Sequence, residues 1–204
     1  MAELIRRSYR EFVGVVADVL EELGIDYGIA GSFASSQYGE PRQTLDVDLT
    51  LHLRPVEADR FAAAFEAVQM AADPYVIRET YDYTAPLPFA VIDYANGWKA
   101  DCYFWRKTAY DQAAFARRLE WPYPEAKRGQ LWLYAPEDVI LMKLVYYQMS
   151  QGVSTKHLRD IAAMLANMNR WEKVLDTAYL EHWAGQLQVS KYWLELWRDF
   201  QLKQ

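Results

Sequence analysis

The sequence predicts an α+β protein, in which a mixed β-sheet with flanking helices over residues 1–134 is followed by a C-terminal helical bundle over 135–204. Two patterns predict the sheet: apolar residues alternate strictly along 45–53, and a strong hairpin signal lies in 89–105. After Ala135 apolar residues recur at helical spacing and no strand pattern interrupts them. The change near Ala135 is a shift in composition and not a flexible linker.

Composition excludes several classes of protein. With 204 residues, of which 52% are hydrophobic, the chain can bury a sizeable core and is not disordered. Its net charge of −6 argues against a general nucleic-acid coat protein. Cys102 is the single cysteine, so no internal disulfide forms, which suits a reducing compartment. Neither an apolar leader nor a bilayer-long apolar run is visible, so we expect a soluble cytoplasmic protein with no membrane partner.

The first elements follow from apolar spacing and from glycine positions. Apolar residues at three- and four-residue steps predict an amphipathic helix over 3–23, which the next glycine ends. Residues 25–32 predict a short strand that runs into a glycine-serine turn, and 34–41 predict a brief helix or loop.

The alternating segment 45–53 is the clearest strand of the chain. Its period of two places Asp46, Asp48, Thr50 and His52 on one face and the apolar residues on the other. A proline then opens a helix that is expected to run from Pro55 to about Met70. Residues 71–88 contain three prolines and match no element pattern.

The hairpin in 89–105 is predicted from Asn96-Gly97, which is typical of a two-residue type I′ turn between two apolar runs. Counting outward from this turn pairs Ile92 with Asp101. Asp93 then points to the opposite face from Asp101. Only one of these two aspartates can therefore join a site on a given face of the hairpin.

The remaining elements are helical. Residues 108–119 predict a helix that the sequence WPYPE interrupts. A proline followed by two acidic residues starts the next helix, which includes VILMKLVYY. The helices predicted after it are 153–167, 171–186 and 190–201.

Three aspartates form the candidate catalytic set. Asp46 and Asp48 lie on one strand face with Cα atoms roughly 6.6 Å apart at about 3.3 Å per residue. Such a pair can hold two hard cations roughly 3.5–4 Å apart. Asp101 stands in the apolar segment ADCYF, where an unpaired carboxylate would be costly. A bound cation, a buried ion pair or a surface location would each remove that cost, and a solvated strand face is the alternative for the pair.

The turn Gly31-Ser32 fits the same kind of site. Glycine after a strand allows a close approach of the backbone to a ligand, and exposed N–H groups with the serine hydroxyl can hold phosphate oxygens. The segment is neither a P-loop nor a dinucleotide-binding motif. Beside three carboxylates in phase, it is interpreted as a phosphate cradle.

These residues carry a family resemblance. GIAGSFAS, followed by RQTLDVDLTL and a later strand carboxylate, resembles the signature of the nucleotidyltransferases of the DNA polymerase β-like superfamily. Gly31, Ser32, Asp46, Asp48 and Asp101 fall on matching positions. PEDVILMKL and KHLRDIAAML resemble the helical half of the minimal, AbiEii-type toxin nucleotidyltransferases, although a histidine stands where relatives often have aspartate.

The resemblance implies a nucleotidyltransferase-like catalytic domain over 1–134 and a helical subdomain over 135–204. The enzyme would move NMP from a nucleoside triphosphate to an acceptor, with two Mg²⁺ ions (Mn²⁺ is the alternative) as cofactors. The three aspartates would hold the metals, and Asp101 would lie nearer the acceptor. The turn glycine and serine would hold the β- and γ-phosphates. Lys143, which otherwise only interrupts an apolar helix, would reach the triphosphate. Arg42 and Thr44 would brace the loop or contact the nucleotide.

Several functions stay open from the sequence. The acceptor is a tRNA, a protein or a small molecule such as an aminoglycoside, and a toxin-antitoxin role would add a cognate antitoxin as partner. The alternative from another class is a non-catalytic nucleotide- or partner-binding member of the same fold. A third reading is an α/β binding module in which the motif is accidental.

Overall fold

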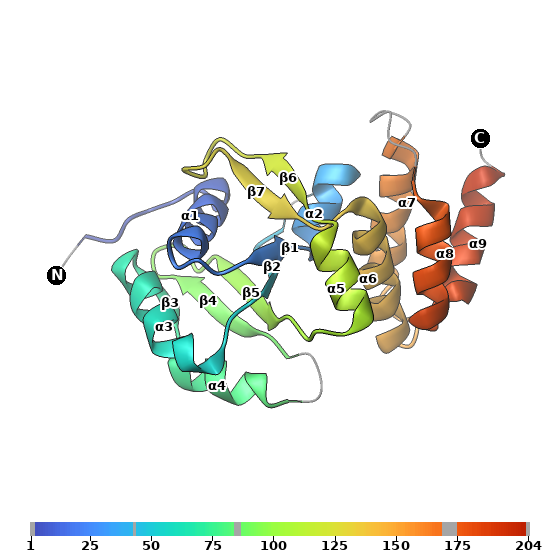
Figure 1. Cartoon of the computed structure of the whole chain (residues 1–204). Helices are drawn as coiled ribbons and strands as arrows, with labels where there is room; N and C mark the ends of the chain where they lie inside the picture. The colour runs from blue at the N-terminus through green and yellow to red at the C-terminus, as the bar shows by residue number, and fades with distance from the viewer. Residues whose placement is uncertain (1–2, 43, 84–86, 169–174, 203–204) are drawn as a thin grey trace. The chain divides into compact units, whose positions relative to one another are not determined.

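The computed structural model describes residues 3–42, 44–83, 87–168 and 175–202. The chain forms two compact units (Figure 1). The first consists of Met1–Ala30 and Thr44–Leu133, and the second consists of Gly31–Gln43 and Tyr134–Gln204.

Seven strands of the described chain form one mixed sheet in the first unit, in the order β3-β4-β5-β2-β1-β7-β6. The pairs β2-β5 and β1-β7 are parallel, and the other neighbours are antiparallel. The predicted α+β class with a mixed sheet is confirmed. The strands are β1 (Tyr27–Ile29), β2 (Asp46–Leu51), β3 (Met70–Ala72), β4 (Phe89–Asp93), β5 (Lys99–Phe104), β6 (Leu119–Pro122) and β7 (Gln130–Leu133).

Strand β2 lies near the middle of this sheet and shows the predicted alternation. Val47, Leu49 and Leu51 are buried, whereas the residues between them are partly exposed. Burying one face of a strand specifies its register strongly, because a slip by one residue would bring the carboxylates into the core. The apolar face thus determines which way the aspartates of β2 point.

The first helix begins six residues later than predicted. Ser8 is its N-cap, and its side chain accepts from the N–H of Glu11 while the Glu11 carboxylate accepts from the N–H of Ser8. This capping box outweighs the apolar spacing of the preceding residues. The helices of the first unit are α1 (Tyr9–Glu22), α3 (Ala58–Ala67), preceded by the short 3₁₀ turn η1 (Pro55–Glu57), α4 (Pro74–Tyr81) and α5 (Ala109–Ala116).

Three strands, β3, β6 and β7, lie where the sequence pattern predicts none. Met70, predicted to end a helix, begins β3, and the unassigned stretch after it contains α4. The signal for α4 was present, since Asp73 caps the helix through its side chain and Pro74 follows at the first helical position. The first two residues of WPYPE end an edge strand, β6, where Pro122 is tolerated because one side of an edge strand needs no donor.

The hairpin of β4 and β5 forms, but its predicted register is wrong by two residues. Ile92 pairs with Lys99 and not with Asp101, and the Asp93 N–H donates to the carbonyl of Trp98, which closes a four-residue loop. A shift of two residues preserves the faces of both strands. The prediction that Asp93 and Asp101 lie on opposite faces therefore survives the error.

The second unit is helical, as the predicted C-terminal bundle requires (Figure 1). Helix α2 packs on α6 and α7, and a side chain at Gly39 would clash with the backbone at Ala163 and Met164, so glycine permits this close approach. Of the helix predicted over 171–186, residues 171–174 lie outside the described residues. The helices are α2 (Gly31–Tyr38), α6 (Pro136–Met149), α7 (Lys156–Met168), α8 (Thr177–Gln186) and α9 (Ser190–Gln201).

No helix within the described ranges is both long and apolar enough to cross a bilayer.

Candidate functional site

The three aspartates lie on one face of two neighbouring parallel strands. The register of β2 and β5 places Asp46 opposite Lys99 and Asp48 opposite Asp101. Residues directly opposed on adjacent strands point to the same side of the sheet, and adjacent strands lie about 4.8 Å apart. These four residues, named here the carboxylate face, therefore form two consecutive rows of three carboxylates and one ammonium.

Lys99 carries the positive charge of this face. Its Nζ lies 2.8 Å from Asp101 Oδ2, and the side chains are 42% and 15% exposed, respectively. The hydrogen bond to Asp101 raises the pKa of Lys99, and the charges of Asp101, Asp46 and Asp48 raise it further. The ammonium is thus held by the field of all three carboxylates. Asp101 has an ion-pair partner, as one alternative from the sequence requires.

Two hydroxyl groups hold Asp46 in place. Thr44 Oγ1 donates to Asp46 Oδ1 at 2.7 Å, and the Tyr9 hydroxyl donates to the main-chain carbonyl of Asp46 at 2.7 Å. Burial, and then the charge of Asp46, raise the pKa of Tyr9 well above its usual value. Thr44 therefore acts on the carboxylate of Asp46. The role of Tyr9 had no sequence signal, since it occupies an ordinary apolar position of the first helix.

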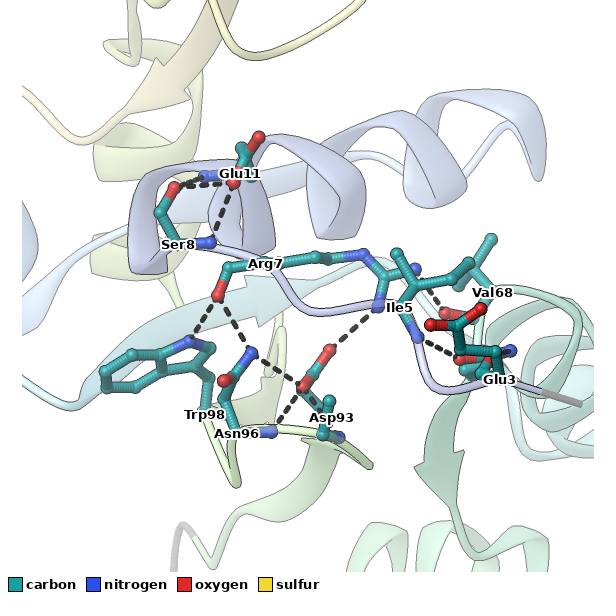
Figure 2. A network of polar contacts seen from close by, with 11 residues as sticks. Glu3, Ile5, Arg7, Ser8, Glu11, Val68, Asp93, Asn96 and Trp98 are labelled. Carbon is teal, nitrogen blue, oxygen red and sulfur yellow. Dashed lines mark hydrogen bonds and ion pairs between the residues drawn. The ribbon is translucent and has the colours of Figure 1, made fainter.

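Asp93 is excluded from the carboxylate face because it is buried on the other face of the sheet and both its oxygens have partners. Its Oδ2 accepts from the Arg7 guanidinium at 2.8 Å, while Oδ1 accepts from the N–H groups of Ala95 and Asn96. Figure 2 shows Arg7 and Asn96 on either side of Asp93. The guanidinium also donates to the Val68 carbonyl. Asp93 thus ties the N-terminal segment to the hairpin loop, and of the two hairpin aspartates Asp101 joins the candidate site.

The donor set of the carboxylate face fits a hard divalent cation, since carboxylate oxygens are the ligands that Mg²⁺ prefers. As the side chains stand, no three aspartate, glutamate, histidine or cysteine side chains of the described residues converge closely enough to hold a metal ion. Asp101 forms an ion pair with the Lys99 ammonium. Residue types and register therefore suit a metal, whereas one of the three carboxylates, Asp101, is paired with the Lys99 ammonium.

The predicted phosphate cradle begins the second unit. Gly31 has a φ of 60° and starts α2, directly after the residue whose N–H donates to the carbonyl of Asp48. A positive φ favours glycine, because a Cβ would crowd the backbone there. Ser32 is at the first turn of α2, where main-chain N–H groups have no partner within the helix. The start of α2 therefore offers N–H groups and a hydroxyl to an anion.

Three charged side chains form a cluster in the second unit, named here the cation cluster: Arg42, Lys143 and Asp160. Lys143 Nζ lies 2.7 Å from Asp160 Oδ2, and both side chains are buried. The Arg42 guanidinium lies 3.2 Å from Asp160 Oδ1 and also donates to the Ser32 hydroxyl. Two cations thus share one carboxylate, and one of them, Arg42, also contacts the serine of the cradle. Of the predicted nucleotide-binding residues, Ser32, Arg42 and Lys143 are thus brought together.

Asp160 is the residue that joins these groups, and sequence reasoning did not assign it a role. Burial raises the pKa of Asp160, but the hydrogen bond and charge of Lys143, and then those of Arg42, outweigh burial and lower it. The carboxylate therefore stays ionised between its two partners. Its signal in the sequence was the segment KHLRD, which matched the resemblance only in part.

His157 lies one helical turn before Asp160. Burial, and then the positive charge of Lys143, lower the pKa of His157 to about 4. The imidazole is therefore neutral near pH 7 and adds no further positive charge to the cation cluster. Its Nδ1 is buried and forms no hydrogen bond with the described residues.

Solved structures share the fold of this chain. An antigenic nucleotidyltransferase-like protein from Paracoccidioides brasiliensis is 20% identical, with a TM-score of 0.56 over 81% of this chain and 78% of that one. The antibiotic-resistance factor ANT(2'')-Ia, in its solution structure, is 15% identical, with a TM-score of 0.56 over 92% and 94% of the two chains. Its crystal structure in complex with adenylyl-2''-tobramycin gives 16% identity and a TM-score of 0.53 over 90% and 98%.

Comparison of sequences finds no match, whereas comparison of structures does. No protein-family model matches the sequence, and no curated protein matches it. At these identities the structural likeness shows the nucleotidyltransferase fold, which is the fold that the resemblance implied.

Proposed function

We propose that this protein transfers NMP from a nucleoside triphosphate to an acceptor in a divalent-metal-dependent reaction. One observation carries the proposal: in a chain with the nucleotidyltransferase fold, Asp46, Asp48 and Asp101 occupy the same face of two parallel strands in direct register. A surface strand with random polar residues would not require a third carboxylate opposite the second one.

The carboxylate face would hold the metal. Asp46 and Asp48 are proposed as ligands of two Mg²⁺ ions, with Mn²⁺ as the alternative, and Asp101 as a ligand of the ion nearer the acceptor. Mg²⁺ bound there supplies charge neutralisation to the transferring phosphoryl group. Thr44 keeps one oxygen of Asp46 directed by its hydrogen bond. Asp101 would accept the proton of the acceptor hydroxyl.

The cradle and the cation cluster would bind the triphosphate. Gly31 and Ser32 offer N–H groups and a hydroxyl, and Arg42 and Lys143 add positive charge that Asp160 only partly cancels. Phosphoryl transfer depends on positioning and charge stabilisation more than on covalent catalysis, so two prepositioned cations are the protein groups it needs.

The acceptor of NMP is proposed from its chemical class. ANT(2'')-Ia was solved with an adenylylated aminoglycoside, and a net charge of −6 on this chain is compatible with a polycationic small molecule. An aminoglycoside-like polyamine is therefore the first acceptor to test, and tRNA or a protein hydroxyl is the second. A toxin role would additionally require a cognate antitoxin. With a single cysteine and no disulfide, a cytoplasmic location is part of the proposal.

The decisive experiment is calorimetric titration of non-hydrolysable nucleoside triphosphates with and without Mg²⁺. Wild type is expected to bind in Mg²⁺ only, and the double variant Asp46→Asn with Asp48→Asn is expected to bind at least about 100-fold more weakly, because the metal ligands are gone. Asp59→Asn is the matched control, since this exposed aspartate pairs with Arg78 outside the site.

Mass spectrometry of candidate acceptors incubated with labelled triphosphate then identifies the product. Modified tRNA with an unmodified aminoglycoside would exclude the antibiotic acceptor. Binding of nucleotide by folded wild type without transfer to any acceptor would favour the non-catalytic alternative. Failure of every triphosphate to bind in Mg²⁺ would overturn the proposed function.

A further inference from the structure

Lys99 stands in the carboxylate face as the register partner of Asp46, one row before the pair Asp48 and Asp101. Its ammonium donates to Asp101 Oδ2 at 2.8 Å. One positive charge thus lies among three negative ones. A divalent cation would bring to this face twice the positive charge that the ammonium supplies.

The side chains of Lys99 and Asp101 differ in solvent exposure, and this difference affects how easily another cation can replace the ammonium. The Lys99 side chain is 42% exposed, whereas that of Asp101 is 15% exposed. A long, partly exposed lysine can release its ammonium to water at little cost, because water solvates the released charge. Asp101 cannot follow it, since its strand is paired on both sides. The cation of this ion pair is therefore exchangeable and the carboxylate is not.

We propose that Lys99 is the internal counter-ion of the carboxylate face, that a divalent cation must displace its ammonium from Asp101, and that Lys99 thereby sets the metal affinity of the site. This inference rests on the proposed function, because it concerns the same carboxylates. A monovalent ion would replace one unit charge by another and gain nothing. A divalent ion gains an additional charge at the same carboxylates, so Lys99 also selects against Na⁺ and K⁺.

The test measures Mn²⁺ binding without nucleotide, by electron paramagnetic resonance of the free ion and by calorimetry, on wild type and on Lys99→Met. The methionine keeps the length of the side chain and removes the charge. We expect Lys99→Met to bind Mn²⁺ about tenfold tighter or more, because a like charge within about 4–6 Å disfavours a bound cation by that order. Lys99→Arg retains the charge and is expected to bind as wild type does.

Lys127→Met is the matched control, since this lysine forms an exposed ion pair with Glu22 elsewhere in the first unit. It is expected to leave Mn²⁺ affinity unchanged. Thermal unfolding supplies a second readout: Lys99→Met should be less stable than wild type in EDTA and should gain more from added Mg²⁺. If the methionine variant does not fold, Lys99→Gln replaces it in the same measurements.

The outcomes separate this inference from the proposed function. Wild type that binds Mn²⁺, with Lys99→Met equal or weaker, overturns the counter-ion role and leaves the proposed function standing. Folded wild type and folded Lys99→Met that both fail to bind Mn²⁺ or Mg²⁺ overturn the metal-dependent function and this inference with it.

Discussion

The carboxylate face of the first unit and the cation cluster of the second unit differ in the sign of their charge and in how deeply their side chains are buried. Asp46, Asp48 and Asp101 lie on a partly exposed strand face, with Lys99 as their internal cation. Lys143 and Asp160 lie on helices α6 and α7 and are almost fully buried, whereas Arg42 lies in the segment after α2. The first set has negative charge in excess, and the second has positive charge in excess.

The difference concerns what each set costs without a ligand. A partly exposed carboxylate face is solvated by water and needs little from the fold. A buried ammonium needs its carboxylate, because an unpaired charge in the interior is strongly destabilising. Stability is therefore expected to depend on the cation cluster, and metal binding on the carboxylate face.

The variant Asp160→Ala tests most directly whether stability depends on the cation cluster. The change removes the carboxylate that pairs with the buried Lys143, and we expect a loss of about 3–5 kcal/mol in the free energy of unfolding. Urea denaturation measures it. The exposed variant Glu22→Ala, which removes the partner of Lys127, is expected to lose at most about 1 kcal/mol. Equal losses for the two variants would contradict the distinction.

The converse variant is Asp101→Asn. Loss of a proposed metal ligand should lower kcat/KM for nucleotidyl transfer at least about 100-fold, comparable with removal of one transition-state donor. Its stability in EDTA should stay within about 1 kcal/mol of wild type, because its partner Lys99 is partly exposed. Asp26→Asn, an exposed aspartate outside the site, is the control for both readouts. A large loss of stability in Asp101→Asn would show that the face is structural.

A smaller effect is expected from Thr44, which orients a proposed metal ligand of the carboxylate face and is not itself one. Thr44→Val removes the hydrogen bond to Asp46 Oδ1 and should weaken Mn²⁺ binding about tenfold, the lower end for outer groups that orient metal ligands. Thr50→Val is matched to it, since Thr50 lies on the same face of β2 beyond Asp48. Calorimetry that finds both threonine variants equal would mean that Asp46 needs no orienting hydroxyl.

The smallest expected effect is a pH dependence in the second unit. The pKa of His157 lies near 4 in the folded chain, below the ordinary value of about 6.5 for an unfolded histidine. As the pH falls through this window, the unfolded chain binds a proton that the folded chain does not, so stability falls. His157→Gln should flatten this slope in unfolding curves between those pH values, and His182→Gln, on the exposed side of α8, should not. Asp160, whose pKa is lowered, acts only at more acidic pH.

Strand parity explains why part of the candidate site was predictable. Alternation along 45–53 is a local property, so it places Asp46 and Asp48 on one face before any partner strand is known. The same parity separates Asp101 from Asp93, even though the predicted hairpin register was wrong by two residues. The error arose because the Asp93 side chain accepts from two loop N–H groups and favours a longer loop.

Short elements were predicted poorly, for a physical reason. Strands β3, β6 and β7 have three or four residues each and are stable only through their neighbours in the sheet. Their own sequences carry too little pattern to indicate a strand. The capping signals at Ser8 and Asp73 were present in the sequence, and giving them more weight than apolar spacing would have placed both helix starts correctly.

By itself the sequence determined which residues carry charge at the site and which face of its strand each aspartate occupies, because side-chain direction along a strand depends on the local backbone alone. Only the tertiary structure decided that β5 lies beside β2 with Lys99 opposite Asp46, and that Asp160 holds Arg42 across 118 positions of the chain. Such partners are chosen by the packing of whole elements, and this choice depends on the entire chain.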